Sequence, residues 1–344
     1  MAENREKVYN KLYTEEKWEN VNKDNKDLVK DFIDYCKSTD KSLETIKQYT
    51  STLNFVMCYI LDFCKNKNFT DLTKRDIIAM QNYFINDCGL SSARISFIKS
   101  VMNSLSTYIE NILDDEFPDF RPIIRKIPNP NKSAVMEKTV LSQEEMDNLL
   151  KQLVAKGLIQ EAFYVALLIS SGVRKAESLR LDLEWFNNEN IIYGCMWKTP
   201  EEIKTKGRGI RGKLLTKYFL INKLKPYLEL WLQERERLGV NIPDMFVYKK
   251  NDTWYPAKIK TLDYWTTKIE NLLGKRFYSH YCRHHYTTSM LEQGLPADVV
   301  KDIVGWANVS MIEVYDDRTK EGKFEKYFNE NGIVKVEEKK LNEL

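Results

Sequence analysis

The placement of proline divides this chain into two parts. Residues 27–112 contain no proline, and apolar residues such as Leu28, Phe32 and Tyr35 recur there at helical spacing. Four prolines then fall within thirteen residues, at positions 118, 122, 128 and 130. Because proline is excluded from helix interiors and stiffens the chain, it predicts a break between domains. We expect a helical domain over residues 26–113 and a linker over residues 114–138.

The part after the linker mixes helical and strand patterns. A capping signal at Ser142 predicts the start of a helix, and residues 161–173 are expected to form a buried helix that ends at Gly172. Further helices are expected over residues 223–238, 259–273, 283–293 and 296–304. Short strands are expected at 191–193 and 213–220, around a basic, glycine-rich turn. We therefore expect a mixed α/β domain with a small antiparallel sheet over residues 139–330. A polar segment (1–25) and a charged tail (331–344) flank the two domains, and the fold class is mostly α (α+β).

Composition limits the partners of the chain. The net charge is only +3, so a surface for nucleic acid must come from local clusters of basic residues. The six cysteines form no C-x-x-C pair, which argues against a zinc ribbon and favours reduced core thiols. The polar N-terminus and the short apolar runs predict neither a signal peptide nor a membrane span. We expect a cytoplasmic protein without a membrane partner.

All three histidines lie within six residues, at His280, His284 and His285, around Arg283. A guanidinium can hold two anionic oxygens, and an imidazole can move a proton near neutral pH, so the cluster suits a phosphate site. His280 and His284 also have the spacing of a metal-binding pair. However, the zincin pattern requires a glutamate where Tyr281 stands, and no distant histidine can act as a third ligand. We expect no metal.

Three further motifs complete the set. In the sequence S-G-V-R-K-A-E, Arg174 follows a glycine, and Glu177 stands three residues later, where it can hold the arginine. The basic turn carries two lysines, 204 and 206, and either can swing toward a phosphate and give up a proton. Gly305-Trp306 is followed nine residues later by Tyr315.

Taken in order, S-G-V-R-K-A-E, the lysine-bearing turn, H-Y-C-R-H, V-G-W and the later tyrosine resemble the tyrosine recombinases of the phage-integrase type. The resemblance implies that Tyr315 attacks a DNA phosphate and forms a 3′-phosphotyrosine. Arg174 and Arg283 would hold the non-bridging oxygens, on which negative charge grows. It further implies a helical core-binding (SAM-like) domain over residues 26–113 and a catalytic domain over 139–330.

The other roles also follow from the resemblance. His280 would act in proton transfer at the nucleophile. Lys206, preferred over Lys204, would protonate the departing 5′ oxygen, and Trp306 would donate its indole N–H to a phosphate oxygen. Glu177 and His284 would support the site. No cofactor is implied, because the two arginines supply the charge and the 5′-hydroxyl reverses the step.

The resemblance also implies partners. Double-stranded DNA with inverted-repeat sites would bind a homo-oligomer of two to four chains. Five basic residues are expected to contact this DNA, four in the first domain and one in the turn: Lys41, Lys47, Arg94, Lys99 and Arg208.

Two alternatives stay open at the level of sequence. Three carboxylates surround the tyrosine (Glu313, Asp316 and Asp317), and they disfavour its approach to a phosphate unless they are turned away. His285 stands where a small hydroxyl residue is usual in the resembling family. Both features favour a non-catalytic DNA-binding regulator on the same fold. A type IB topoisomerase-like enzyme would share the chemistry without sequence-specific synapsis.

Overall fold

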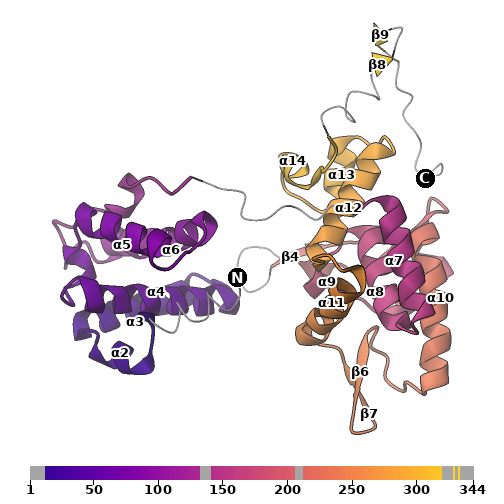
Figure 1. Ribbon diagram of the computed structural model, residues 1–344, viewed down its shortest axis with the longest axis horizontal. Helices are drawn as coiled ribbons and strands as arrows, with labels where there is room; N and C mark the ends of the chain where they lie inside the picture. Colours follow the sequence, from indigo (N-terminus) through magenta and orange to yellow (C-terminus); the bar gives the residue numbers. More distant parts are fainter. Residues whose placement is uncertain (1–11, 132–140, 206–211, 320–327, 330–331, 334–344) are drawn as a thin grey trace. The chain divides into compact units, whose positions relative to one another are not determined.

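The structure is a computed structural model that describes residues 12–131, 141–205, 212–319, 328–329 and 332–333 (Figure 1). The chain forms two compact units that divide between residues 137 and 138. Helices dominate both units, and the strands form small antiparallel sheets in the second. The expected fold class is therefore confirmed. No helix within the described ranges is long and apolar enough to cross a membrane.

The first unit is built from helices. They are α2 (Glu15–Asn20), α3 (Lys23–Ser38), α4 (Leu43–Phe63), α5 (Lys74–Asn86) and α6 (Ser92–Ile112), with 3₁₀ turns η1 (Phe69–Asp71) and η2 (Ile124–Lys126). Each α-helix begins after a residue whose side chain accepts a hydrogen bond from a first-turn amide. At α5, Thr73 and Asp76 cap each other's backbone amides.

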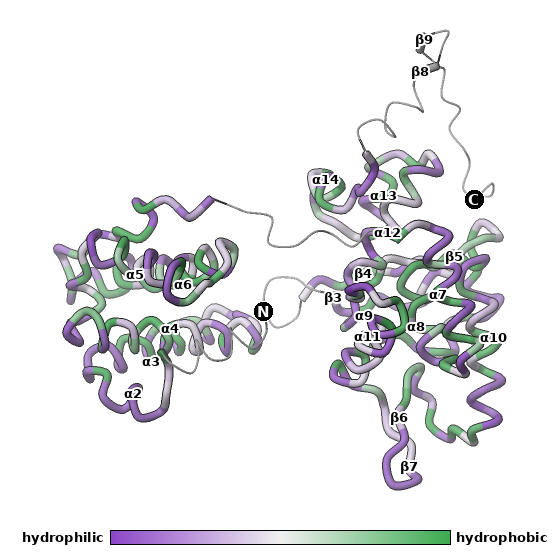
Figure 2. Tube along the Cα trace, in the orientation of Figure 1, coloured by the Kyte–Doolittle hydropathy of each residue, from purple (hydrophilic) through white to green (hydrophobic). Residues whose placement is uncertain are grey.

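The core of this unit lies between the helices. Along their trace in Figure 2, hydrophobic and hydrophilic residues alternate, which is the pattern of helices with one buried face. Val56 and Ile60 of α4 and Ile98 and Leu105 of α6 are fully buried. Because these residues recur four and seven positions apart, the same face of each helix enters the core.

The polar N-terminal segment is not separate from this unit. Leu12 and Val21 are buried in the helical core, and Trp18 packs against it. The Asn22 side-chain amide donates to the Asn66 carbonyl at 2.6 Å. From Leu12 onward the segment expected over residues 1–25 therefore packs on the helical unit, because a few apolar residues are enough to dock α2.

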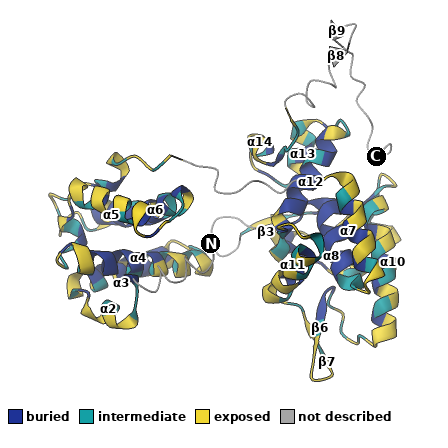
Figure 3. Ribbon diagram, viewed as in Figure 1, coloured by how far each residue is buried: buried dark blue, intermediate teal, exposed yellow. Residues whose placement is uncertain are grey.

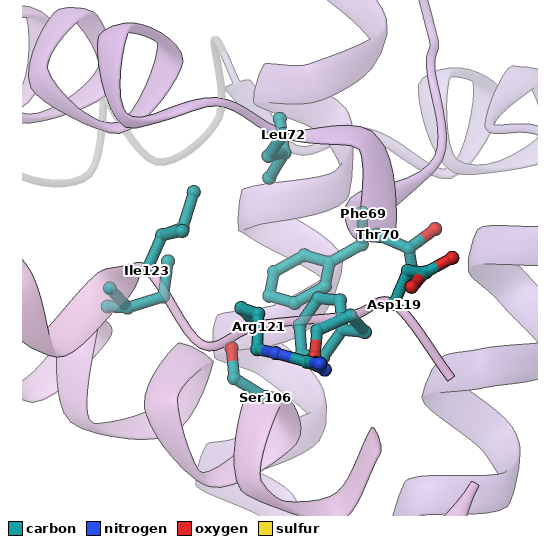
Figure 4. Close-up of a pocket in the computed structure, with 9 residues that line it drawn as sticks. Phe69, Thr70, Leu72, Ser106, Asp119, Arg121 and Ile123 are labelled. Atoms are coloured by element: carbon teal, nitrogen blue, oxygen red, sulfur yellow. The ribbon is translucent and has the colours of Figure 1, made fainter. Parts of the chain in front are cut away.

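The first half of the expected linker also belongs to the first unit. Ile124 is 2% exposed, and Phe117 and Phe120 pack on the same core. This segment closes a small pocket of about 90 Å³ against η1 and α6, shown in Figure 4. The prolines exclude a helix, but they do not prevent apolar side chains between them from packing.

The second unit is larger. Its helices are α7 (Gln143–Ala155), α8 (Ile159–Ser171), α9 (Lys175–Ser178), α10 (Ile221–Leu238), α11 (Ile259–Leu273), α12 (Ser279–Glu292), α13 (Ala297–Val304) and α14 (Met311–Tyr315), with turns η3 (Leu183–Trp185) and η4 (Asn188–Asn190). Every residue from Glu161 to Ser171 is buried, so α8 is the central helix (Figure 3). Helices α7, α10 and α12 pack around it.

The strands of this unit are short. They are β1 (Ile191–Ile192), β2 (Met196–Lys198), β3 (Ile203–Thr205), β4 (Lys213–Leu215), β5 (Tyr218–Leu220), β6 (Val247–Lys250), β7 (Thr253–Pro256), β8 (Phe328–Asn329) and β9 (Gly332–Ile333). β1, β2 and β5 form one antiparallel sheet, and β3–β4, β6–β7 and β8–β9 are separate antiparallel pairs.

The single strand expected over residues 213–220 is two strands. β4 pairs with β3, whereas β5 pairs with β2, so the chain changes sheets between Leu215 and Tyr218. Lys217, at the change, is 1% exposed. Its amide donates to Thr199 Oγ1 at 3.0 Å, and its carbonyl accepts from the Thr199 amide at 2.9 Å. These two bonds replace the strand ladder at that point.

The packing of the proline-rich segment can be tested through Ile124. Replacing Ile124 with alanine should lower the free energy of unfolding of the first unit by about 2–4 kcal/mol, because buried aliphatic groups are lost from its core. Urea unfolding of the full chain, followed by circular dichroism, measures this change. Ile112→Ala is the control, since Ile112 is 51% exposed and should cost no more than about 0.5 kcal/mol. Equal costs for both variants would contradict the packing.

Candidate active site

A left-handed turn places Arg174 at the start of α9. α8 ends at Gly172, whose φ of 62° suits glycine, and the Gly172 amide donates to the Leu168 carbonyl at 2.8 Å. A Cβ atom at Gly172 would lie 2.8 Å from the Tyr286 ring, so the position also lacks room for a side chain. The chain then turns, and Arg174 becomes the residue before the first turn of α9.

Glu177 fixes Arg174. The Arg174 amide donates to Glu177 Oε2 at 3.0 Å, and Arg174 Nη1 donates to Glu177 Oε1 at 2.7 Å. Glu177 is buried, whereas the Arg174 side chain is about a quarter exposed (27%) and can meet a ligand. The supporting role that the sequence predicts for Glu177 therefore has a geometric basis.

A buried lysine that sequence reasoning missed joins this pair. Lys217 Nζ lies 3.3 Å from Glu177 Oε2, and both side chains are almost completely buried. Burial alone would raise the pKa of Glu177, but the charges of Lys217 and Arg174, together with hydrogen bonds from Arg174, hold it below its usual value. A lysine in a strand-like segment is usually solvated, so nothing in the pattern indicated this contact.

Arg283 of α12 connects three segments of the unit. Its Nη1 donates to the Gly172 carbonyl at 2.7 Å, and its Nη2 donates to the Val304 carbonyl, at the end of α13, at 3.3 Å. Burial lowers the pKa of Arg283 to about 10, and the nearby charge of Arg174 contributes to the shift. The two guanidiniums therefore lie close enough to repel each other, as in a site built for an anion.

Trp306 and Tyr315 pack over Arg283. Gly305 ends α13 with a φ of 80°, and Trp306 follows with its ring centroid 5.1 Å from the Arg283 guanidinium carbon. The Tyr315 and Trp306 ring centroids are 4.7 Å apart, and the Arg283 guanidinium carbon is 5.8 Å from the Tyr315 ring centroid. Cation–π contacts of this kind partly offset the cost of burying the charge.

His280 holds the hydroxyl of Tyr315. A hydrogen bond of 2.7 Å joins Tyr315 Oη to His280 Nε2. The His284 ring, one turn further along α12, packs on Tyr315 with centroids 4.5 Å apart. His284 Nδ1 is 3.2 Å from Asp317 Oδ2, which orients the ring from its other side. The tyrosine is therefore aligned by both histidines of the i, i+4 pair.

Four polar side-chain atoms around this site are buried without a hydrogen-bond partner among the described residues: Arg283 Nε, Trp306 Nε1, His284 Nδ1 and Tyr286 Oη. The first two are N–H donors. A buried donor that lacks an acceptor is costly, and such groups in native structures commonly serve a ligand. Both belong to side chains that the sequence predicts to contact phosphate, so an anionic oxygen fits the chemistry of the donors.

Two of the three carboxylates beside Tyr315 are balanced by a cation or surrounded by solvent. Asp316 accepts two hydrogen bonds from Arg318, at 2.8 and 2.9 Å, and Glu313 is exposed. Asp317 faces the His284 ring. The electrostatic argument for a non-catalytic protein therefore rests on Asp317 alone.

His285 does not crowd the site. It lies on another face of α12, where its Nε2 is 3.2 Å from Gln143 Oε1 of α7. Burial, with the charge of Lys223, lowers the pKa of His285 to about 4. The imidazole is therefore neutral at physiological pH and belongs to the packing between α7 and α12.

The predicted lysines of the turn are placed only in part. Lys206 and Arg208 lie outside the described residues. Lys204 is the middle residue of β3, its side chain is exposed, and its carbonyl accepts from Arg180 Nη1 at 2.5 Å. The choice between Lys204 and Lys206 stays a prediction.

Of the four basic residues singled out in the first unit, one has a structural role. Lys99 is 7% exposed, and its ammonium donates to Gln81 Oε1 and to the carbonyls of Ile127 and Pro128, at 2.8–2.9 Å. It ties the proline-rich segment to α6, so we remove it from the proposed DNA-binding set. Lys47 and Arg94 line one shallow pocket between α4 and α6, and Lys41 precedes α4.

Comparisons with known proteins identify a family for both units of the chain. Residues 139–321 match the phage integrase family, and residues 28–119 match the phage integrase N-terminal SAM-like domain. The SPbeta prophage-derived recombinase-like protein YomM of Bacillus subtilis is 26% identical over 283 residues, which cover 81% of this chain and 82% of YomM. Tyrosine recombinase XerA of Pyrococcus horikoshii is 24% identical over 292 residues, 85% of this chain and 89% of XerA.

A solved structure has the same fold. The XerH site-specific recombinase bound to palindromic difH substrate, in its post-cleavage complex, aligns with a TM-score of 0.62 and 20% identity, over 82% of this chain and 78% of XerH. Because the family match spans more than half of the sequence, the chain belongs to the phage integrase family, as an enzyme of the tyrosine recombinase type.

The turn at Gly172 can be tested against another helix-ending glycine. Gly172→Ala should cost about 1–3 kcal/mol more unfolding free energy than Gly239→Ala, because a methyl group at Gly172 displaces Tyr286, whereas Gly239 has open space at nearly the same φ. Urea unfolding of both variants measures the difference. Matching losses would show that Gly172 is needed only for its backbone angle.

The neutral state of His285 predicts a dependence of stability on pH. The pKa of His285 in the folded chain, about 4, lies below the unfolded value of 6.5. The contribution of the neutral imidazole to the free energy of unfolding is therefore complete above pH 6.5 and is lost as the pH falls toward 4. This loss amounts to as much as about 3 kcal/mol. In His285→Gln the unfolding free energy should fall less than in the wild type between pH 7 and pH 4.5. Parallel pH curves would contradict a neutral, buried imidazole.

Proposed function

We propose that this chain is a site-specific DNA recombinase that cuts and rejoins strands through Tyr315. The observation that carries the proposal is the hydrogen bond between Tyr315 Oη and His280 Nε2, within a site that also contains two arginines and an indole N–H. A phenol is a weak nucleophile at neutral pH, so a base at hydrogen-bond distance is what its activation requires.

In the proposed reaction, Tyr315 Oη attacks a DNA phosphorus atom while His280 Nε2 takes the phenolic proton. The bond from phosphorus to the 5′ oxygen breaks, and Lys206 gives that oxygen a proton. The product is a 3′-phosphotyrosine and a free 5′-hydroxyl. Attack by a 5′-hydroxyl of a partner strand reverses these steps, so no net hydrolysis occurs.

Arg174, Arg283 and Trp306 stabilise the transition state in this scheme. The non-bridging oxygens carry one negative charge in the phosphodiester and approach two as the nucleophile adds. Arg174 offers a partly exposed guanidinium, and Arg283 Nε and Trp306 Nε1 offer buried donors. Donors held in place before the reaction stabilise the added charge without reorganising.

We further propose that the DNA partner has inverted-repeat sites and is bound by two to four copies of the chain. The palindromic substrate of XerH supports this, because a symmetric site matches symmetric protein copies. Lys41, Lys47, Arg94 and Arg208 would contact phosphates and set the position on the duplex. The protein would act in the cytoplasm, where its DNA is accessible.

The nucleophile can be tested directly. Genomic fragments bound by the full chain identify the target, and a nicked suicide substrate carrying that site traps the covalent intermediate. Tyr315→Phe should bind this DNA within about threefold of the wild-type affinity, because the phenyl ring still packs on Trp306 and Arg283, yet form no adduct on a denaturing gel. Tyr218→Phe is the matched control and should form the adduct normally.

Two outcomes would contradict the proposal. An adduct in Tyr315→Phe would assign the nucleophile to another residue. Tight, salt-sensitive binding by the wild type without any adduct would indicate a regulator rather than an enzyme. Relaxation of a supercoiled plasmid that lacks the site would instead indicate a topoisomerase-like activity.

A further inference from the structure

We propose that Lys217 is a positioning residue for strand cleavage, acting through Glu177 on Arg174. The inference rests on the proposed recombinase function and adds to it a residue outside the motifs that define the site. Lys217 follows β4, at the point where the chain leaves the β3–β4 hairpin and enters the three-stranded sheet.

The backbone of Lys217 is held in place by hydrogen bonds that do not involve its side chain. Thr199 bonds both its amide and its carbonyl, at 3.0 and 2.9 Å. The side chain is buried, and its ammonium lies 3.3 Å from Glu177 Oε2. This is the same oxygen that accepts the Arg174 amide, while the other oxygen, Oε1, accepts the Arg174 guanidinium. Lys217 therefore limits how the carboxylate can turn, and the carboxylate limits how Arg174 can turn.

The charge balance gives Lys217 a second effect on the reaction. The charged groups that act on its ammonium are Glu177, Arg174 and Arg283. With all four groups ionised, three positive charges and one negative charge leave a net charge of +2. A phosphodiester carries one negative charge and approaches two in the transition state, so a site at +2 favours the transition state over the ground state. Loss of the Lys217 proton would reduce the net charge to +1.

If Lys217 served only to stabilise the fold, its ion pair with Glu177 would be replaceable. Buried ion pairs can often be replaced by apolar side chains of similar volume without loss of stability, provided that both charges are removed together. A structural Lys217 would therefore be replaceable together with Glu177, with no effect on the rate of cleavage. A positioning Lys217 would not, because Arg174 would lose the carboxylate that orients it.

The environment of Lys217 also predicts how cleavage depends on pH. Burial, together with the charges of Arg283 and Arg174, lowers the pKa of Lys217 to about 8, although Glu177 opposes the shift. The ammonium is therefore present at pH 7 and is lost as the pH rises through this value. The rate of adduct formation should decline over the same range, and an arginine at position 217 should keep its charge there.

The test compares Lys217→Met, Lys217→Arg and Lys217→Met/Glu177→Gln in the full chain. The rate constant of adduct formation is measured from pH 6 to pH 10 on the nicked suicide substrate at saturation, and affinity is measured separately by gel shift. Lys217→Met should react about 10- to 100-fold more slowly than the wild type at pH 7, and its affinity should change by less than about threefold. Lys217→Arg should keep most of the rate at pH 7 and lose the decline above pH 8.

Lys223→Met is the matched control. Lys223 of α10 is half-buried, and burial lowers its pKa as well. Its ammonium, however, contacts Ser289 Oγ at 3.4 Å and contacts neither Glu177 nor Arg174. It should react at the wild-type rate. If Lys217→Met fails to fold, as judged by circular dichroism, the Lys217→Arg profile decides the question, because the double variant also lacks the carboxylate of Glu177. The double variant should fold and still react slowly.

The proposal is overturned if Lys217→Met reacts within twofold of the wild type, if the double variant regains the wild-type rate, or if Lys217→Arg declines at the same pH as the wild type. A wild-type chain that binds its site but forms no adduct would instead overturn the recombinase function itself, and with it any role in cleavage. The two failures are therefore distinguishable.

Discussion

The site depends on the burial of one charge, the guanidinium of Arg283. A cation in the interior is costly unless its donors are satisfied, and Arg283 satisfies two of them with the carbonyls of Gly172 and Val304. Those carbonyls end α8 and α13, the segments just before Arg174 and Trp306. The hydrogen bonds that stabilise the buried Arg283 guanidinium therefore hold the segments of the other site residues together. These residues lie up to 141 positions apart in the sequence, from Arg174 to Tyr315.

Repulsion among the cations is the cost of this arrangement, and Glu177 offsets it. Its buried carboxylate contacts both Arg174 and Lys217, and these contacts hold its pKa low despite burial. Of the nearby carboxylates, Asp316 is paired with Arg318, so it does not cancel the positive charge, and Asp317 faces the His284 ring. A net positive site beside an aligned phenol is what catalysis on a phosphodiester requires.

Sequence reasoning located the site more completely than it located the boundaries of the units. Arg174, His280, Arg283, Trp306 and Tyr315 were predicted from the resemblance of their ordered motifs to a known family, and the structure brings these residues together. Lys217 was not predictable, because its burial depends on the change of sheets after β4, which periodicity does not encode. Lys99 was misassigned for a related reason, since a lysine inside a helix such as α6 can face either solvent or a neighbouring carbonyl.

The predicted limits of the first unit differ from the structure where a few apolar residues decide the packing. Leu12 and Ile124 lie in polar or proline-rich segments, and each is buried because it meets a large core formed elsewhere in the chain. Local composition describes the segment and not the surface on which it packs.

The central claim is that one chain supplies both the nucleophile and the arginines that receive the phosphate. Mixing two inactive variants, Arg174→Gln and Tyr315→Phe, on the suicide substrate tests it most directly. The geometry predicts no adduct, because no chain in the mixture has both Tyr315 and Arg174. Recovery of the adduct at a rate near a quarter or more of the wild-type rate would show that the tyrosine serves a neighbouring chain, and would contradict the account.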